Sequence, residues 1–347
     1  MKFIHMADVH FGRPFENIPK KKIEDDLRKA QRNAFKKVID IIKEEETDYL
    51  FISGDLFEQK YVEDETIKYI ISLFESIKET QIFIAPGNHD PLIKSSPYNT
   101  FSWPENVYIF SNDLGIYEFD RVCIYGFGFD NYEKIDNNIL PIPVDKEKVN
   151  ILITHGTLNG NSLKYNDIKE RDIKNFDYVA LGHIHLPKID NSAIIYPGSL
   201  VPLGFDEIGK RGVIKGEIIF NGEDSSTIEY QFEEISEKQF DVVELDISNY
   251  NSIYEIEDAI SLKDNHYYKI ILAGTKNIDV LDVIDTMMKK ENVIRIEDQT
   301  RCQIDLEELS KQDNLKGIFV KKMLEEAKNN PSNSTSIYGA IDYVLNI

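Results

Sequence analysis

The sequence predicts an α/β fold with four layers, in which two sheets pack face to face and helices cover their outer faces. Residues 2–85 alternate between short apolar runs and long stretches with helical periodicity, which is the β-α-β-α-β order of a parallel sheet with right-handed crossovers. Residues 107–232 then carry many short apolar runs separated by tight turns. Two sheets that share a core explain this order best, because each sheet must bury an apolar face.

The N-terminal part contains the clearest elements. We expect strands at residues 2–6, 49–53 and 81–85, where short apolar runs are followed by polar or turn-forming residues. Helices are expected at residues 22–45 and 64–78, because apolar residues recur there every three or four positions and so share one face. The later strands are expected at residues 107–110, 116–119, 122–127, 150–154, 178–181, 193–196, 213–220 and 226–232.

The sequence divides into three parts. A polar stretch at residues 233–239 marks the boundary of a first domain of residues 1–235. Residues 240–300 then alternate strand and helix patterns, which predicts a small α/β module. Residues 310–347 form a helical segment that the Asn/Pro/Ser run at 329–334 divides into two helices. Each helix has an apolar face. We expect these faces either to pack on the first domain or on each other, or to bind a partner. They contain Leu315, Ile318, Phe319, Met323, Leu324 and Ala327 in the first helix, and Ile337, Ala340, Ile341 and Val344 in the second.

The composition is that of a globular protein, since 41% of the 347 residues are hydrophobic. No apolar run reaches the roughly 20 residues of a membrane span, and the N-terminus enters a strand without a signal-peptide core. The two cysteines, Cys123 and Cys302, show neither metal spacing nor a disulfide framework. We therefore expect a cytoplasmic protein with no membrane partner.

The net charge of −21 counts against a simple nucleic-acid-binding protein, which usually has a basic surface. Two bound divalent ions would add about four positive charges to the site. One basic run also follows the first polar motif, and it is either a solvated helix face or a patch that contacts phosphates. This run contains Lys20, Lys21, Lys22, Arg28, Lys29, Arg32, Lys36 and Lys37.

Five short polar motifs, at residues 8–10, 54–55, 87–90, 154–156 and 182–185, each follow an apolar run that predicts a strand. Polar residues at the ends of several strands of an α/β sheet converge on one crevice. The motifs supply seven oxygen or imidazole ligands, which is more than one ion needs and suits two divalent ions that share a carboxylate. We therefore predict a two-metal centre that hydrolyses phosphate esters. Its ligands are Asp8, His10, Asp55, Asn88, His155, His183 and His185.

Two further residues are predicted to act in catalysis. His89 lies beside a ligand but is not needed as one, so we expect it to bind the phosphate and protonate the departing oxygen. Asp90 is expected to accept a hydrogen bond from the other ring nitrogen of His89, which would raise the pKa of that imidazole. By contrast, His5, His266 and Trp103 have no partner motif, and we interpret them as structural residues.

The five motifs, in this order, resemble those of the calcineurin-like metallophosphoesterase superfamily over roughly residues 1–220. The resemblance implies that Asp55 bridges the two ions and that His89 is the catalytic histidine. It also implies two ligand sets, Asp8, His10, Asp55 and His185 around one ion, and Asp55, Asn88, His155 and His183 around the other.

A narrower resemblance is to the SbcD-type DNA repair nucleases. It depends on Gly-Asp-Leu-Phe-Glu at 54–58, Leu-Gly-His-Ile-His-Leu-Pro at 181–187 and, above all, the run from Tyr196 to Gly212. This resemblance implies a manganese-dependent exonuclease and endonuclease with a capping domain at residues 240–300. It also implies homodimers and a coiled-coil ATPase partner, SbcC-like, that docks on C-terminal helices. The C-terminal tail is also similar to that of the YhaO-like branch of these nucleases.

One position departs from part of the family. Glu58 stands where archaeal and eukaryotic relatives carry a histidine linked to exonuclease action, whereas bacterial members often carry an acidic residue. The preference between exonuclease and endonuclease cleavage therefore stays open. A phosphatase or nucleotide phosphodiesterase would use the same ligands, and the net charge favours it slightly. A scaffold without catalysis is disfavoured, because buried Asp and His without a metal would be costly.

Overall fold

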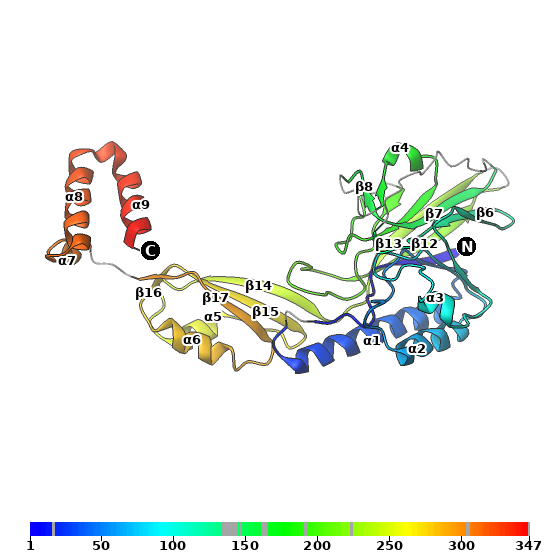
Figure 1. The fold of residues 1–347 in the computed structure, drawn as a ribbon, viewed down its shortest axis with the longest axis horizontal. Coiled ribbons are helices and arrows are strands. Elements are labelled where there is room, and N and C mark those ends of the chain that lie inside the picture. Colours follow the sequence, from blue (N-terminus) through cyan, green and yellow to red (C-terminus); the bar gives the residue numbers. More distant parts are fainter. Residues whose placement is uncertain are drawn as a thin grey trace. The chain divides into compact units, whose positions relative to one another are not determined.

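The computed structural model describes residues 1–15, 18–133, 145, 147–160, 166–190, 193–222, 225–302 and 306–345 (Figure 1). The chain forms two compact units, one of residues 1–241 with 265–267 and the other of residues 242–264 with 268–347. The predicted division into domains 1–235, 240–300 and 310–347 stays a prediction. Among the helices of the described residues, none combines the length and apolarity that crossing a bilayer requires.

The first unit contains a six-stranded sheet in the order β13-β12-β1-β2-β3-β4. Strands β1 to β4 are parallel, while β12 pairs antiparallel with β1 and with β13. The central strands are buried on both faces, which explains their unbroken apolar runs. The strands are β1 (Lys2–Met6), β2 (Tyr49–Ile52), β3 (Gln81–Ile84), β4 (Val107–Ile109), β12 (Gly212–Phe220) and β13 (Ser226–Glu234).

Helices α1 (Lys21–Glu45) and α2 (Asp64–Glu75) connect the first three strands and lie side by side (Figure 1). Each buries one apolar face, as the periodicity of the sequence predicts. The ring of Phe35 in α1 contacts both Phe11 and Phe74, with centroid distances of 5.2 and 6.0 Å. The two helices therefore form an outer layer on the first sheet.

The second sheet of this unit has the order β11-β10-β7-β6-β5, and it is parallel except for the β5–β6 pair. Ile168, Ile173 and Phe176 pack on its outer face, and Ile173 belongs to the short helix α4 (Glu170–Ile173). The strands are β5 (Gly115–Glu118), β6 (Val122–Phe127), β7 (Val149–His155), β10 (Tyr178–Gly182) and β11 (Ile194–Ile195). Smaller elements are α3 (Pro97–Thr100) and the pair β8 (Thr157–Leu158) and β9 (Asp167–Ile168).

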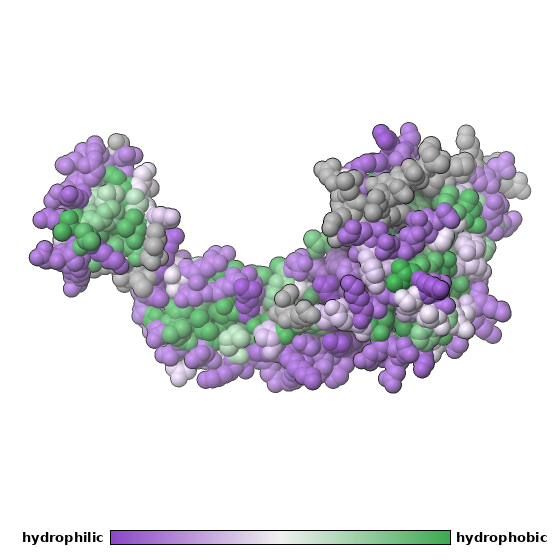
Figure 2. Space-filling model, viewed as in Figure 1, coloured by the Kyte–Doolittle hydropathy of each residue, from purple (hydrophilic) through white to green (hydrophobic). Residues whose placement is uncertain are grey.

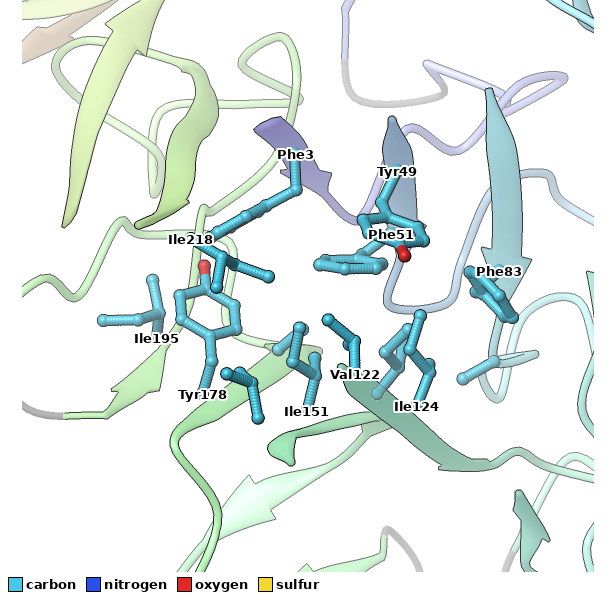
Figure 3. Packing of buried hydrophobic residues seen from close by; sticks show 14 of the residues in the cluster. Phe3, Tyr49, Phe51, Phe83, Val122, Ile124, Ile151, Tyr178, Ile195 and Ile218 are labelled. Carbon is cyan, nitrogen blue, oxygen red and sulfur yellow. The ribbon is translucent and has the colours of Figure 1, made fainter. Parts of the chain in front are cut away.

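The two sheets pack face to face over an aromatic core (Figure 3). Phe3, Phe51 and Phe83 from the first sheet meet Ile151 and Tyr178 from the second, and all five are buried. The ring of Phe3 contacts Tyr178 edge-on at 4.9 Å. The predicted α/β sandwich is therefore confirmed.

The second unit contains a small sheet in the order β14-β15-β17, in which β15 and β17 are parallel. Its core includes Ile256 from α5, Ile270 from β15 and Val283 from α6. Strands β16 (Thr275–Lys276) and β18 (Arg301–Cys302) form a separate parallel pair. The remaining elements are β14 (Gln239–Asp246), α5 (Ile253–Ala259), β15 (His266–Ala273), α6 (Val280–Met287) and β17 (Val293–Asp298).

The C-terminal helices of this unit form a hairpin in which α8 (Leu315–Asn329) and α9 (Ser334–Leu345) lie side by side. Val320 and Ala327 from α8 pack with Ile337 and Ile341 from α9. The sequence left open whether these helices pack on the first domain or on each other, and the structure shows that they pack on each other. Apolar residues remain on the surface of the hairpin (Figure 2), including Leu315, Ile318, Tyr338, Tyr343 and Val344. Short helices at Leu306–Leu309 (α7) and Pro331–Asn333 (η1) precede α8 and α9.

Candidate metal centre

The predicted ligands lie where strands of the first unit end. Asp8 follows β1, Asp55 follows β2 and His155 ends β7. The backbone N–H of Asp8 donates to the carbonyl of Gly54 at 3.1 Å, and that of His10 donates to the carbonyl of Asp55 at 2.9 Å. These bonds fix the first two motifs against each other, as expected for neighbouring parallel strands.

Glycines allow the motifs of the two sheets to approach closely. Gly54 has φ +86°, and a Cβ atom there would clash with the imidazole of His155. A Cβ atom on Gly182 would clash with the carbonyl oxygen of Ser53. Any side chain at either position would therefore push His155 away from the first sheet.

Four of the predicted ligand residues have left-handed backbone conformations, which residues other than glycine rarely adopt. The φ angles are 52° at Asp8, 53° at His10, 54° at Asp55 and 95° at His183. Such a conformation costs on the order of 1–2 kcal/mol for a residue with a Cβ atom. Strain of this kind is typical of functional sites, because it turns side chains toward a common point.

The side chains of five predicted ligands converge, with their potential metal-binding atoms close together. The Oδ2 atom of Asp55 lies 3.6 Å from Nε2 of His10 and 3.3 Å from Nε2 of His155, so its carboxylate stands between two histidines. Asp8 Oδ1 lies 3.8 Å from Nε2 of His185. The Nε2 atoms of His10 and His185 are only 3.2 Å apart.

The other two predicted ligands complete the group. Asn88 Oδ1 lies 3.2 Å from Nε2 of His155, and the ring of His183 stands edge-on to that of His155 at 5.2 Å. The backbone N–H of His183 also donates to both carboxylate oxygens of Asp8 at 3.1 Å. The structure thus brings all seven predicted ligand residues together around one centre.

Hydrogen bonds at Nδ1 fix the orientation of three histidines that are predicted ligands. Nδ1 of His10 bonds to Glu58 at 2.9 Å, Nδ1 of His185 bonds to Glu207 at 2.6 Å, and Nδ1 of His155 bonds to the carbonyl oxygen of Ser53 at 2.8 Å. Each acceptor requires a proton on Nδ1, which leaves the Nε2 lone pair of the neutral ring for a metal ion.

This hydrogen-bond pattern fits a bound cation. The Nε2 atoms of His10 and His185 lie 3.2 Å apart, so the two rings share a proton when the site holds no ion, and a cation that displaces this proton would lie near both lone pairs. Carboxylate, amide and imidazole groups form a donor set that suits borderline-hard divalent ions. The residues present are therefore compatible with a dinuclear centre of divalent metal ions.

The pKa values show how strongly these charges interact. Burial alone would raise the pKa of Asp55, but His155 and His10 outweigh burial and lower it well below its usual range. Burial would lower the pKa values of His155 and His185, but carboxylates raise both to about 9, chiefly Asp55 for His155 and Glu207 for His185. Binding of divalent ions must therefore displace protons from these histidines.

His89 and Asp90 differ from the prediction in one respect. Nδ1 of His89 bonds to Glu58 Oε2 at 2.8 Å, and the predicted contact with Asp90 is wrong. The Asp90 carboxylate turns inward and accepts hydrogen bonds from the backbone N–H groups of Asp55, Leu56 and Gly87 at 2.6–3.0 Å. It also accepts from Tyr98 Oη at 2.7 Å. Asp90 thus satisfies buried N–H groups of two ligand loops.

Glu58, like Glu207, is a site residue whose role the sequence did not predict. One oxygen of its carboxylate bonds to His10 and the other to His89, so it holds a predicted ligand and the predicted acid together. Burial would raise the pKa of Glu58, but the hydrogen bonds from these two histidines lower it to about 2. The available signal was its place three residues after Asp55, at the end of the same motif.

The residues predicted to be structural have structural contacts. His5 is buried and bonds to Tyr178 Oη at 3.0 Å and to Ser53 Oγ at 2.9 Å. His266 bonds to Asp241 at 2.6 Å. Trp103 packs on Phe74 and Tyr98, with centroid distances of 6.0 and 5.5 Å.

Apart from Lys20, which precedes the helix, the basic run lies on α1, and its members make varied contacts. Arg32 donates to Thr66 Oγ1 at 2.9 Å and stacks over Tyr69, while Lys36 pairs with Asp40. Arg28 and Lys29 are exposed. These contacts are those of a solvated helix face, and contact with phosphates stays a prediction.

Comparison with known proteins agrees with this geometry. The family model described as calcineurin-like phosphoesterase matches residues 1–187, which contain all five motifs. The metallophosphoesterase YhaO of Bacillus subtilis is 26% identical over 283 residues, which cover 75% of this chain and 68% of that protein. One component of the SbcCD nuclease of Staphylococcus epidermidis is 26% identical over 332 residues, covering 84% of this chain and 83% of that protein.

A third relative is the DNA double-strand break repair protein Mre11 of Methanopyrus kandleri. It is 26% identical over 276 residues, which cover 71% of this chain and 59% of that protein. The family match covers more than half of the chain, and the described ligand geometry lies inside it. The chain therefore belongs to the calcineurin-like phosphoesterase family, as a metal-dependent phosphodiesterase.

Proposed function

We propose that this chain is a manganese-dependent DNA nuclease of double-strand-break repair. The single observation that carries the chemistry is the group of three histidines whose Nε2 atoms are held toward Asp8 and Asp55. The relatives named as an SbcCD nuclease component and as Mre11 support DNA as the substrate. Both exonuclease and endonuclease cleavage are compatible with this proposal.

The ligands are assigned to two ions. Asp8, His10 and His185 would hold one ion, and their ligand atoms lie within 4.8 Å of one another. Asn88, His155 and His183 would hold the other, with Asp55 shared. When bound, the two ions supply a water of lowered pKa and positive charge beside the phosphate.

In this proposal His89 holds the proton for the leaving oxygen. Burial would lower the pKa of His89, but the hydrogen bond to Glu58 and the charge of Asp55 raise it above its usual value. Its Nδ1–H group donates to Glu58, so Nε2 carries the proton that can be transferred. The side chain of His89 is 41% exposed, which leaves it accessible to a substrate.

A phosphatase or nucleotide phosphodiesterase is the alternative function. The net charge of −21 favours it, because a polyanion is repelled by an acidic surface. YhaO is described only as a metallophosphoesterase, which is compatible with either function. Exposed basic residues of α1, such as Arg28 and Lys29, offer contacts to a DNA backbone that a small substrate does not need.

The α8–α9 hairpin is the proposed docking site for a coiled-coil ATPase partner. The relative from Staphylococcus epidermidis is itself named as one subunit of a nuclease, which supports a multi-subunit enzyme. Exposed apolar residues at Leu315 and Ile318 would contact the partner. A homodimer of the catalytic chain is part of the same proposal.

The test is hydrolysis by purified protein with added Mn²⁺. End-labelled single-stranded and double-stranded DNA are compared with bis(p-nitrophenyl) phosphate and p-nitrophenyl phosphate, and Asp55→Ala serves as the inactive control. We expect cleavage of DNA and of the diester, both abolished by EDTA and by Asp55→Ala. Rapid hydrolysis of the monoester with intact DNA would reject the nuclease in favour of a phosphatase.

A further inference from the structure

Residues 198–211, here called the Glu207 loop, are built around the predicted metal ligand His185. The backbone N–H of Ser199 donates to the carbonyl oxygen of His185 at 2.9 Å, and Ser199 also bridges to Ala7, the residue before Asp8. Gly198 has φ +78°, and a Cβ atom there would meet the carbonyl oxygen of His185 at 2.6 Å. The loop thus contacts the main chain beside two predicted ligands.

Glu207 extends this contact to the side chain of His185. Its Oε1 atom accepts from Nδ1 of His185 at 2.6 Å. Its Oε2 atom accepts from Ser199 Oγ at 2.7 Å and from the backbone N–H of Leu203 at 3.0 Å. Both oxygens of this carboxylate therefore accept hydrogen bonds, and the carboxylate cannot rotate without breaking at least one of them.

Arg211 balances the charge of this carboxylate. The Arg211 side chain is 1% exposed, and its Nε atom lies 3.8 Å from Glu207 Oε2 without a hydrogen-bond partner among the described residues. Its other nitrogens donate to the carbonyl oxygens of Lys210 and Ile208. A buried guanidinium needs a nearby negative charge, and Glu207 lies within ion-pair distance.

We propose that Glu207 is a positioning residue for His185, and that the Glu207 loop exists to hold this ligand. The carboxylate keeps the proton of His185 on Nδ1 and fixes the ring so that Nε2 faces Asp8 and His10. Ser199 and Leu203 hold the carboxylate in place, and Arg211 lies beside it as a counter-ion. The loop therefore couples its own folding to metal binding at His185.

This proposal goes beyond the substrate and reaction proposed above. It depends on the metal centre and not on DNA, so a failure of the nuclease proposal leaves it intact. It also gives a role to the run from Tyr196 to Gly212, which the two-metal mechanism does not use. Glu207 lies 22 residues after His185 in the sequence, so the two residues do not belong to one local motif.

The experiment compares Glu207→Gln with the metal-free wild-type protein in Mn²⁺ titrations followed by calorimetry and by electron paramagnetic resonance. Glutamine has one acceptor oxygen and one NH2 group. The NH2 group must therefore point either at the donors Ser199 and Leu203 or at the Nδ1–H group of His185, and one of these hydrogen bonds is lost. We expect one of the two ions to bind about 10–100-fold more weakly, the range for lost support of a metal ligand. The signal of a spin-coupled ion pair should then require a correspondingly higher Mn²⁺ concentration.

Two further variants keep the experiment decisive. Glu217→Gln makes the same chemical change at an exposed carboxylate outside the Glu207 loop and should leave both affinities unchanged. Ser199→Ala removes one donor to Glu207 and should weaken the same ion about 2–10-fold, the fold-change for one hydrogen bond. It also decides the question if Glu207→Gln does not fold. Wild-type affinity for both ions in the Glu207→Gln protein, or in Ser199→Ala where Gln does not fold, would overturn the proposal.

Discussion

At the scale of single residues, Glu58 joins the metal centre to the proposed acid through one carboxylate. Glu58→Gln leaves only one acceptor oxygen for the two Nδ1–H groups of His10 and His89. We expect turnover of bis(p-nitrophenyl) phosphate to fall about 10–100-fold at saturating Mn²⁺. Glu63→Gln, which changes an exposed residue nearby, is the control. Equal rates for the two variants would show that Glu58 has no role in the site.

The role of His89 can be separated from metal binding. His89→Ala removes the proposed proton donor but none of the seven predicted ligands. We expect both Mn²⁺ ions to bind as in the wild-type protein, while turnover falls about 10²–10⁴-fold, the usual contribution of general acid catalysis. Calorimetry and steady-state kinetics on the same sample check both results. Loss of an ion would make His89 a ligand, and an unchanged rate would remove it from the mechanism.

His5 makes the stability of the fold depend on pH. Burial lowers the pKa of His5 from 6.5 to about 3, so the unfolded chain binds a proton at pH 5 and the folded chain does not. The stability from this residue is complete above about pH 6.5 and decreases as the pH falls toward 3, by up to about 1.4 kcal/mol per pH unit.

The effect of His5 is measured by urea unfolding with EDTA at pH 7, 6 and 5. The difference in unfolding free energy between wild type and His5→Gln should shrink at low pH, because glutamine does not titrate. A difference that stays constant over this range would contradict the assignment.

The sequence was sufficient to name the seven predicted ligands that the structure brings together, because each follows a buried strand. It was not sufficient for the residues that support them. Glu58 lies 48 residues from His10, and Asp90 turns away from its neighbour His89 to satisfy buried backbone groups. Such contacts depend on how the loops pack, which no pattern within one motif records.

At the scale of elements, long periodic helices and buried strands agree with the prediction to within a few residues. Helix α1 was expected at 22–45 and spans Lys21–Glu45, and β6 was expected and found at 122–127. The missed elements are short, such as α3, α4 and the β8–β9 pair. Elements of two to four residues are too short to show a period, and tertiary contacts decide them.

Helix α1 ends at a residue that can be improved. Glu46 follows the helix with φ 52° and ψ 55°, a left-handed conformation that suits glycine. We expect Glu46→Gly to raise the free energy of unfolding by about 1 kcal/mol, because it removes the strain of a Cβ atom there. Glu44→Gly, in an exposed position inside the helix, should lower it by about 1 kcal/mol. Urea denaturation of both variants checks the opposite signs.

At the scale of the whole molecule, the predicted catalytic residues and the C-terminal hairpin lie in different units. The hairpin core consists of residues from α7, α8 and α9, so a chain that ends at Cys302 loses this core as a whole. We expect residues 1–302 to remain folded and to hydrolyse bis(p-nitrophenyl) phosphate at the full-length rate. Co-purification with an SbcC-like ATPase should be lost. Aggregation of the shortened chain would show that the hairpin belongs to the structural core.

The layers of the first unit could be predicted from the order of the elements in the sequence and from the need to bury both faces of the parallel strands. The surface on which the C-terminal helices pack could not be predicted from the sequence, because an amphipathic face is equally suited to any apolar surface. The packing of Val320 and Ala327 against Ile337 and Ile341 decides between those surfaces for the buried part of the hairpin.

The left-handed backbone at Asp8, His10, Asp55 and His183 has an evolutionary consequence. Strain in the main chain is a burden that only selection for hydrolysis maintains. In a lineage released from that selection, glycine at any of these four positions would relieve strain and delete a predicted ligand in one substitution. Loss of the centre would therefore increase the stability of the fold, and we expect an inactive descendant to carry glycines at these predicted ligand positions while its aromatic core is still intact.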